Sequence, residues 1–314
     1  MGTRKLFYLV IAIMIAGMFS CKKDTVIPTG VIYYSHPDED TINAPVGAIN
    51  GLFSVNDSMQ VYFSQGNLQY QASTNTWHFA EHQWDYVGTQ TPDGNGNSGG
   101  TVDGSDNANA SETYDGWIDL FAWGTSGFDH GAVCYHPWST SSNYGDYYAY
   151  GDWHNNLYDQ TGQADWGYNP IVNGGNIVNM WHTLTKDEWD YVFNRRSTNS
   201  GIRYAKAQVN GVNGEILLPD DWNTFYYELN HNPNHNYSSN VITASQWTTL
   251  ERQGAVFLPA TTGWKYGGTT AVSYSGLYGC YWSSSTVDNN KAYDYKGVSF
   301  RVLGVSVRLV CFAK

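Results

Sequence analysis

The chain alternates short apolar runs with polar turns, and this restricts it to folds built from many short strands. Segments 52–55 and 61–63 have strand-like spacing on either side of a polar turn, which predicts a hairpin. Segments 68–70 and 77–79 predict a second one. Of 314 residues, 33 are glycine and only 14% are charged. Such a composition is typical of a turn-rich chain, so we expect mostly short strands and loops.

Two segments have the signature of a helix. Thr185 is followed three residues later by Glu188, which is a capping box, and apolar residues then recur at helical spacing. The second segment begins at Thr243 with Gln246 in the corresponding position and ends at Gly254. Together with the strands, this predicts an α+β domain with two or so helices and many loops.

The N-terminal residues are typical of an export signal. A basic pair precedes an almost continuous apolar run over residues 6–19, and Ser20-Cys21 follows at once. We therefore expect residues 1–20 to be a lipoprotein signal peptide, with Cys21 as the lipidation site that anchors the protein to a membrane. An ordinary secretory signal with an incidental cysteine is the alternative. The expected location is the bacterial cell envelope, with the outer membrane favoured.

The remaining chain divides by composition. Residues 21–46 hold scattered prolines and acids without a period, which predicts a tether. We expect a single domain over residues 47–314, with N-terminal hairpins at 47–88 and a polar insertion at 89–110. Because 28 acidic residues oppose 16 basic ones and no basic stripe occurs, nucleic acid is not an expected partner.

Three motifs could suggest a metal, and none predicts one. The insertion alternates ligand-type residues as a calcium loop does, but it has Ser98 where such a loop needs glycine, so calcium is only the weaker alternative to a solvated loop. His78 and His82 form an H-x-x-E-H pattern in a strand-like segment, where they would lie about 13 Å apart. His231 and His235 lie in an asparagine-rich loop. We expect no metal site and no cofactor.

Cysteines and a polar cluster leave two questions open. If Cys21 is lipidated, three other cysteines remain, and an odd number allows at most one disulfide. An enzyme hypothesis requires Asp129, His130 and Cys134 to meet in a pocket with perturbed pKa values.

Residues 175–314 carry an ordered series of short motifs. The series consists of Trp181–Trp189, Leu217-Leu218-Pro219, Val256–Ala260, Tyr281–Ser284 and Gly304–Arg308. It resembles the Fibrobacter succinogenes major paralogous domain, a lipoprotein-associated module on the C-type lectin fold. The helix start at Thr185 is similar to that of the formylglycine-generating-enzyme-like branch of the same fold. The resemblance implies a C-type lectin-like domain.

The resemblance also argues against the oxidase activity of the enzyme branch. That branch holds copper with two cysteines about five residues apart, close after a tryptophan, because thiolates suit Cu(I). Here residues 283–287 follow Trp282 without a cysteine, and the next cysteine is Cys311. We therefore predict no catalytic residue. Cys280 and Cys311 can form the one disulfide if their strands are neighbours.

The function expected from these features is glycan binding by a non-catalytic envelope lipoprotein. Tyrosine and tryptophan rings stack on sugar faces. The candidate ligand-binding residues are Trp138, Tyr147, Tyr148, Trp153 and Trp264. For each of them, filling the core of a loop-rich fold is the alternative. An adhesin or pilus-tip assembly subunit that binds an envelope protein, and an enzyme on the same scaffold, remain as other hypotheses.

Overall fold

The computed structural model describes residues 44–89, 102–103, 105–108, 110–232, 236–260, 271–272 and 279–313. Residues 42–314 form one compact unit. The expected signal peptide, Cys21, nearly all of the tether, most of the insertion and Trp264 lie outside the described residues. Among the helices that are described, none has the length and apolar character needed to cross a membrane.

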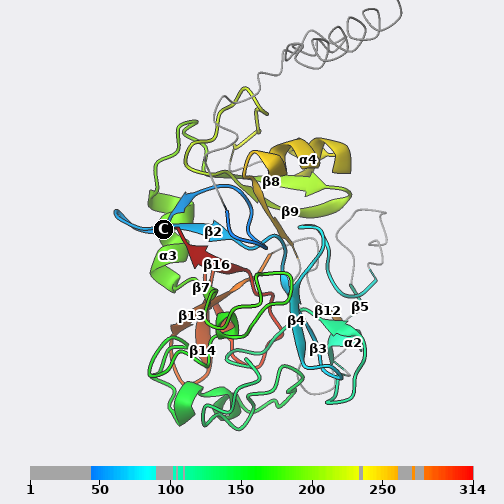
Figure 1. The fold of residues 1–314 in the computed structure, drawn as a ribbon, viewed down its shortest axis with the longest axis vertical. Helices are drawn as coiled ribbons and strands as arrows, with labels where there is room; N and C mark the ends of the chain where they lie inside the picture. The colour runs from blue at the N-terminus through cyan, green and yellow to red at the C-terminus, as the bar shows by residue number, and fades with distance from the viewer. Residues whose placement is uncertain are drawn as a thin grey trace, which may run out of the picture. The chain divides into compact units, whose positions relative to one another are not determined.

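The first sheet joins the two ends of the described domain. Its strand order is β1 (Phe53–Ser54), β2 (Gln60–Phe63), β16 (Leu309–Phe312) and β7 (His182–Thr183), and each pair is antiparallel. β1 and β2 form the first expected hairpin. β16 lies between β2 and β7, as Figure 1 shows. The sheet therefore needs segments from the start, middle and end of the domain.

The second sheet carries the longer strands. Its order is β10 (Val241–Ile242), β8 (Tyr204–Val209), β9 (Val212–Leu217) and β11 (Val256–Pro259). β10 pairs with β8 in parallel, and the other pairs are antiparallel. The two-residue turn between β8 and β9 is Asn210-Gly211, and both residues have positive φ, as a tight hairpin turn requires.

Three smaller sheets hold the other strands of the described residues. β4 (Thr76–Phe79), β3 (Leu68–Gln71) and β6 (Trp117–Ile118) form one of them, so the second expected hairpin is confirmed. β13 (Trp282–Thr286), β14 (Lys291–Asp294) and β15 (Val298–Phe300) form another. β5 (Val102–Asp103) pairs with β12 (Ala271–Val272). β16 begins at Leu309, and Val305 and Ser306 form isolated bridges before it.

Both expected helices are present with their capping boxes. α3 (Lys186–Asp190) begins after Thr185 and continues into η5 (Tyr191–Arg195), a π-helical turn. α4 (Ala244–Arg252) begins after Thr243 and buries Trp247 and Leu250. The remaining helical turns are short: α2 (Ser105–Ala108), η2 (Tyr144–Tyr147), η3 (Ala149–Gly151), η4 (Trp166–Tyr168) and η6 (Tyr237–Ser239). The molecule is thus a mixed α+β protein, mostly of strands and loops.

The core is rich in tryptophan and contains buried arginines. Among the described residues, seven tryptophans are fully buried: Trp123, Trp166, Trp181, Trp189, Trp222, Trp247 and Trp282. Arg308 is buried as well, and it donates to the side-chain oxygens of Asn67 and Gln83 and to the carbonyl of Phe257. Burial lowers the pKa of Arg308 to about 10. This side chain ties the last strand to the N-terminal hairpins and to β11.

Candidate functional site

Two neighbouring cavities share Tyr204 and Lys296, and we call them together the Lys296 groove. The larger holds about 450 Å³ and lies between the α3–η5 helix and the β14–β15 hairpin. The smaller holds about 340 Å³ and is lined by the start of β8, by Glu215 of β9 and by the loop at His231. Because the shared residues stand on the border, Lys296 divides the groove in two.

The α3–η5 helix positions one wall of the larger cavity. The N–H of Glu188 donates to the Thr185 hydroxyl over 3.2 Å, and the Glu188 carboxylate accepts from the N–H of Thr185 over 2.8 Å. At the π-helical turn, the Asn194 side chain donates to Asp190 over 2.9 Å. Such turns are frequent at functional sites. Here the turn places amide and carboxylate groups beside the cavity and keeps Phe193 buried beneath it.

The β14–β15 hairpin forms the opposite wall. The N–H of Asp294 donates to the carbonyl of Gly297, and the N–H of Lys296 donates to the Asp294 carboxylate, each over 3.1 Å. The other carboxylate oxygen of Asp294 accepts from the Ser299 hydroxyl over 2.7 Å. The turn is therefore held in one shape, with Tyr295 in the core and Lys296 exposed at the groove.

Tyr293 gives the larger cavity an aromatic surface. Its side chain is half-buried and lines the cavity, and the Lys186 ammonium lies 5.7 Å from its ring centroid. Asp190 and Asn194 belong to the same lining. A partly open ring with carboxylate and amide groups around it can stack on a flat apolar face and exchange hydrogen bonds at its rim.

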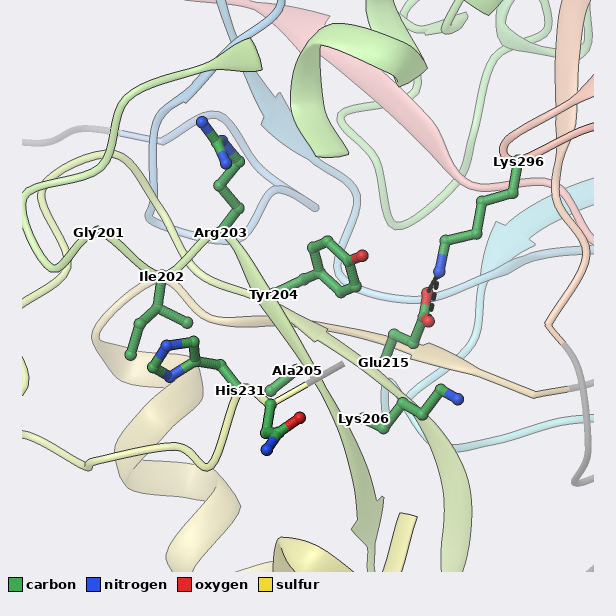
Figure 2. Close-up of a pocket in the computed structure, with 10 residues that line it drawn as sticks. Gly201, Ile202, Arg203, Tyr204, Ala205, Lys206, Glu215, His231 and Lys296 are labelled. Atoms are coloured by element: carbon green, nitrogen blue, oxygen red, sulfur yellow. Dashed lines mark hydrogen bonds and ion pairs between the residues drawn. The ribbon is translucent and has the colours of Figure 1, made fainter. Parts of the chain in front are cut away.

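The Lys296 side chain ends inside a ring of aromatic groups. Its ammonium lies 4.7 Å from the ring centroid of Phe193, 4.9 Å from that of Tyr204 and 5.1 Å from that of Tyr295. It also donates to both carboxylate oxygens of Glu215. Figure 2 shows Lys296 and Glu215 pointing toward each other, with Tyr204 beside them. We call these three rings and the Glu215 carboxylate the ammonium cage.

The described aromatic residues among the candidates from the sequence have partners within the protein. Tyr147 is fully buried, and its hydroxyl donates to the carbonyl of Ser141, so it offers no surface for stacking. Tyr148 and Trp153 both contact Arg301. The guanidinium of Arg301 lies 5.4 Å from the Tyr148 ring centroid, and one of its nitrogens donates to the carbonyl of Trp153 over 3.0 Å.

Trp138 packs its ring on other side chains. Its ring stacks on those of Tyr70 and His136, at 6.0 Å and 4.4 Å between centroids. Trp138 packs against the same core cluster that contains Tyr70. Because Trp138 is only partly buried, its ring contacts the core and keeps some exposed surface.

Asp129 and His130, which the enzyme hypothesis requires, form hydrogen bonds with the nearby backbone. His130 donates from Nε2 to the carbonyl of Gly124 over 2.9 Å, and its Nδ1 accepts from the N–H of Tyr150 over 3.1 Å. Both ring nitrogens of the neutral imidazole therefore have a hydrogen-bond partner. Burial lowers the pKa of His130. Asp129 accepts from the N–H of Gly131. Burial also raises the pKa of the Cys134 thiol, so no activated nucleophile results.

Cys134, Cys280 and Cys311 are all thiols, and the expected Cys280–Cys311 disulfide is not formed. Tyr281, which follows Cys280, forms a β-bridge with Ser306. Ser306 lies five residues before Cys311, which corresponds to about 16 Å along an extended chain. The Cys280 sulfur lies instead 3.4 Å from the Ser299 hydroxyl. Burial raises the pKa of Cys280 well above its usual value, so this thiol stays protonated.

The histidines of the metal-like motifs have other partners. His78 lies in β4, where its Nε2 is 2.7 Å from the Gln69 side-chain oxygen and its ring stacks on Trp117. His82 lies in a turn beside Asp85. His231 lines the smaller cavity, and His235 is outside the described residues. In the part of the chain that the structure describes, no group of three or more metal-binding side chains occurs.

No family model matches the chain, and no curated protein or solved structure matches it either. The assignment of a site therefore depends on geometry alone. Sequence reasoning missed the Lys296 groove because its cage residues come from η5, β8, β9 and the turn after β14. The one local signal was the run Tyr293-Asp294-Tyr295 directly before Lys296 and Gly297.

Proposed function

We propose that this protein is a non-catalytic cell-envelope lipoprotein that binds a glycan in the Lys296 groove. The observation that carries the proposal is the half-buried Tyr293 ring in an open cavity whose rim holds Asp190 and Asn194. Sugar rings have apolar C–H faces that stack on aromatic rings, and their hydroxyls need both donors and acceptors.

The polar groups of the groove are already oriented by the protein. Asp190 accepts from Asn194 and pairs with Arg195, and Asp294 accepts from Ser299. A ligand therefore meets groups that are fixed before it binds, which reduces the entropy cost of recognition. Since these carboxylates have partners within the chain, the larger cavity suits a neutral sugar face.

The proposed lipid anchor and location in the cell envelope come from the sequence. The apolar N-terminal segment and Cys21 support a lipid anchor, with the outer membrane as the favoured location. The motif series over residues 175–314 supports a C-type lectin-like domain of the Fibrobacter succinogenes major paralogous type. The Lys296 groove takes the place of the five aromatic candidates from the sequence as the proposed binding site.

A glycan array tests the proposal. The chain without residues 1–21 is applied with and without calcium, beside Tyr293→Ala and Phe225→Ala. Phe225 is 77% exposed and lies outside the lining of the groove, so it is the matched aromatic control. We expect a defined set of glycans to bind, about tenfold weaker binding for Tyr293→Ala and no change for Phe225→Ala.

Failure to bind any glycan under either condition would remove this function. A stoichiometric protein partner in a pull-down from the native envelope would then favour the adhesin or assembly-subunit hypothesis.

A further inference from the structure

The ammonium cage has the composition of a cation-binding site, but the chain's own Lys296 occupies it. Three aromatic rings lie within about 5 Å of one ammonium, whereas an ordinary surface ion pair has no such rings around it. Glu215 adds a carboxylate that is only 8% exposed. Aromatic rings and a shielded carboxylate are the groups with which proteins recognise alkylammonium ligands.

We propose that the cage is a subsite for the ammonium group of a ligand, and that Lys296 is its internal competitor. The ligand class rests on the proposed function: a glycan that carries a free amino group. When such a sugar enters, its ammonium takes the place of the Lys296 ammonium between the rings and on Glu215. No bond is made or broken in this exchange.

The cage is fixed, whereas its occupant can leave. Phe193 and Tyr295 are buried among core residues, and Glu215 is held in the middle of β9 between β8 and β11. Lys296 lies on the exposed hairpin turn, and its side chain is 38% exposed. A lysine has a flexible four-carbon stem, so it can turn outward without a change in the backbone.

The Glu215 carboxylate makes an empty cage unfavourable. Without one, the poorly exposed Glu215 carboxylate would lose its charged partner, and this is costly in a shielded site. The other lysine nearby is Lys206, which lies opposite Glu215 in the β8–β9 register. Its ammonium, however, lies 5.8 Å from the ring centroid of Tyr237. A ligand ammonium is therefore the natural substitute for Lys296.

The position of the cage links it to the glycan site. Lys296 and Tyr204 line both cavities, so the cage lies on the border between them. A ligand that displaces Lys296 would join the two cavities and could extend from Tyr293 to His231. An N-acetylated sugar carries no charge at that nitrogen and cannot replace the lysine.

A chemical-rescue experiment tests the cage. Lys296→Met keeps an unbranched side chain one atom shorter and removes its charge, and butylammonium is the probe, with butanol as the uncharged control. We expect butylammonium to raise the Tm of Lys296→Met by several times the shift seen with wild type, and we expect Glu215→Gln in the same background to abolish the response. Equal shifts with butanol and butylammonium would overturn the cage assignment.

Titration with sugars tests the ligand class. Wild type and Lys296→Met are titrated with a glucosamine oligomer and with the matching N-acetylglucosamine oligomer. We expect wild type to bind the amino form about tenfold tighter, and Lys296→Met to bind it tighter still. Equal affinity for both forms would overturn this inference and leave glycan binding intact. Absence of binding by both forms and by every glycan on the array would remove the proposed function, while the butylammonium response reports on the cage independently.

Discussion

At the scale of single residues, the Asp220 carboxylate joins the β1–β2 hairpin to Arg196. One of its oxygens accepts from the guanidinium of Arg196 over 2.9 Å. The other accepts from the backbone and hydroxyl of Ser54 and from the side chain of Gln60. Arg196 has no exposed side-chain surface, so its charge depends on this partner.

We predict that Asp220→Asn lowers the free energy of unfolding by about 3 kcal/mol, because it leaves the buried Arg196 charge without its counter-ion. Urea denaturation measures the change. Asp187→Asn is the control, since Asp187 is 82% exposed in its pair with Lys186 and should change stability by less than about 0.5 kcal/mol. Similar losses in both variants would contradict the role given to Asp220.

His182 makes stability depend on pH. Its ring stacks on Phe312, and its Nε2 is buried without a hydrogen-bond partner. Burial lowers the pKa of His182 from 6.5 to about 4. Between these values the unfolded chain binds a proton that the folded protein does not, so stability is lost as the pH falls. Asp119 acts in the opposite direction, because burial raises its pKa from 3.8 to about 6.

Since the two groups oppose each other, the contribution of His182 has to be isolated by substitution. We predict that the stability of His182→Phe relative to wild type increases steadily as the pH falls from 6.5 to 4. Urea denaturation at pH 7, 6, 5 and 4 gives this difference. A difference that stays constant with pH would show that His182 does not titrate as described.

At the scale of elements, the end of α4 is set by a close contact between two glycines. Gly254 follows the helix with a φ of +88°, a conformation that L side chains rarely adopt. A Cβ atom on Gly254 would also lie only 2.7 Å from the Cα of Gly51. The helix end and the entry to β1 therefore pack backbone against backbone.

We predict that Gly254→Ala destabilises the protein by about 1–2 kcal/mol through its backbone conformation and by a further 1–3 kcal/mol through the clash with Gly51. Gly162→Ala is the matched control, because Gly162 has a φ of +73° and open space around it. Thermal unfolding of both variants separates the two effects. Equal losses would mean that the contact with Gly51 carries no energy.

Helices whose capping interactions lie within a few residues could be predicted from the sequence, whereas the Lys296 groove could not. The capping boxes at Thr185 and Thr243 each lie within four residues, so the sequence contains the whole interaction. Tyr147 was expected to face a ligand, but whether a ring is buried depends on segments far away in the chain. The cage likewise unites η5, β8, β9 and one turn, and no sequence spacing records that meeting.

At the scale of the whole molecule, the last strand lies between a strand from the start of the domain and one from its middle. β16 lies between β2 and β7, and Leu309 and Val310 are fully buried. The loss of β16 would leave two strands without a neighbour and open the core beneath them. Residues 1–41, in contrast, lie outside the described residues.

We predict that deletion of residues 309–314 abolishes cooperative thermal unfolding, because the central strand of the first sheet is removed. Deletion of residues 1–41 should leave the Tm within about 2 °C of the full chain. Differential scanning calorimetry of both truncated chains makes the comparison. A cooperative transition after loss of β16 would contradict this account of the fold.

The central claim is that the Lys296 groove binds glycan through Tyr293. Isothermal titration of wild type and Tyr293→Ala with the glycan that binds best on the array tests it most directly. We predict that Tyr293→Ala weakens binding about tenfold, a loss of about 1.4 kcal/mol, while its Tm stays near that of wild type. An unchanged affinity in a folded Tyr293→Ala protein would show that the glycan binds elsewhere.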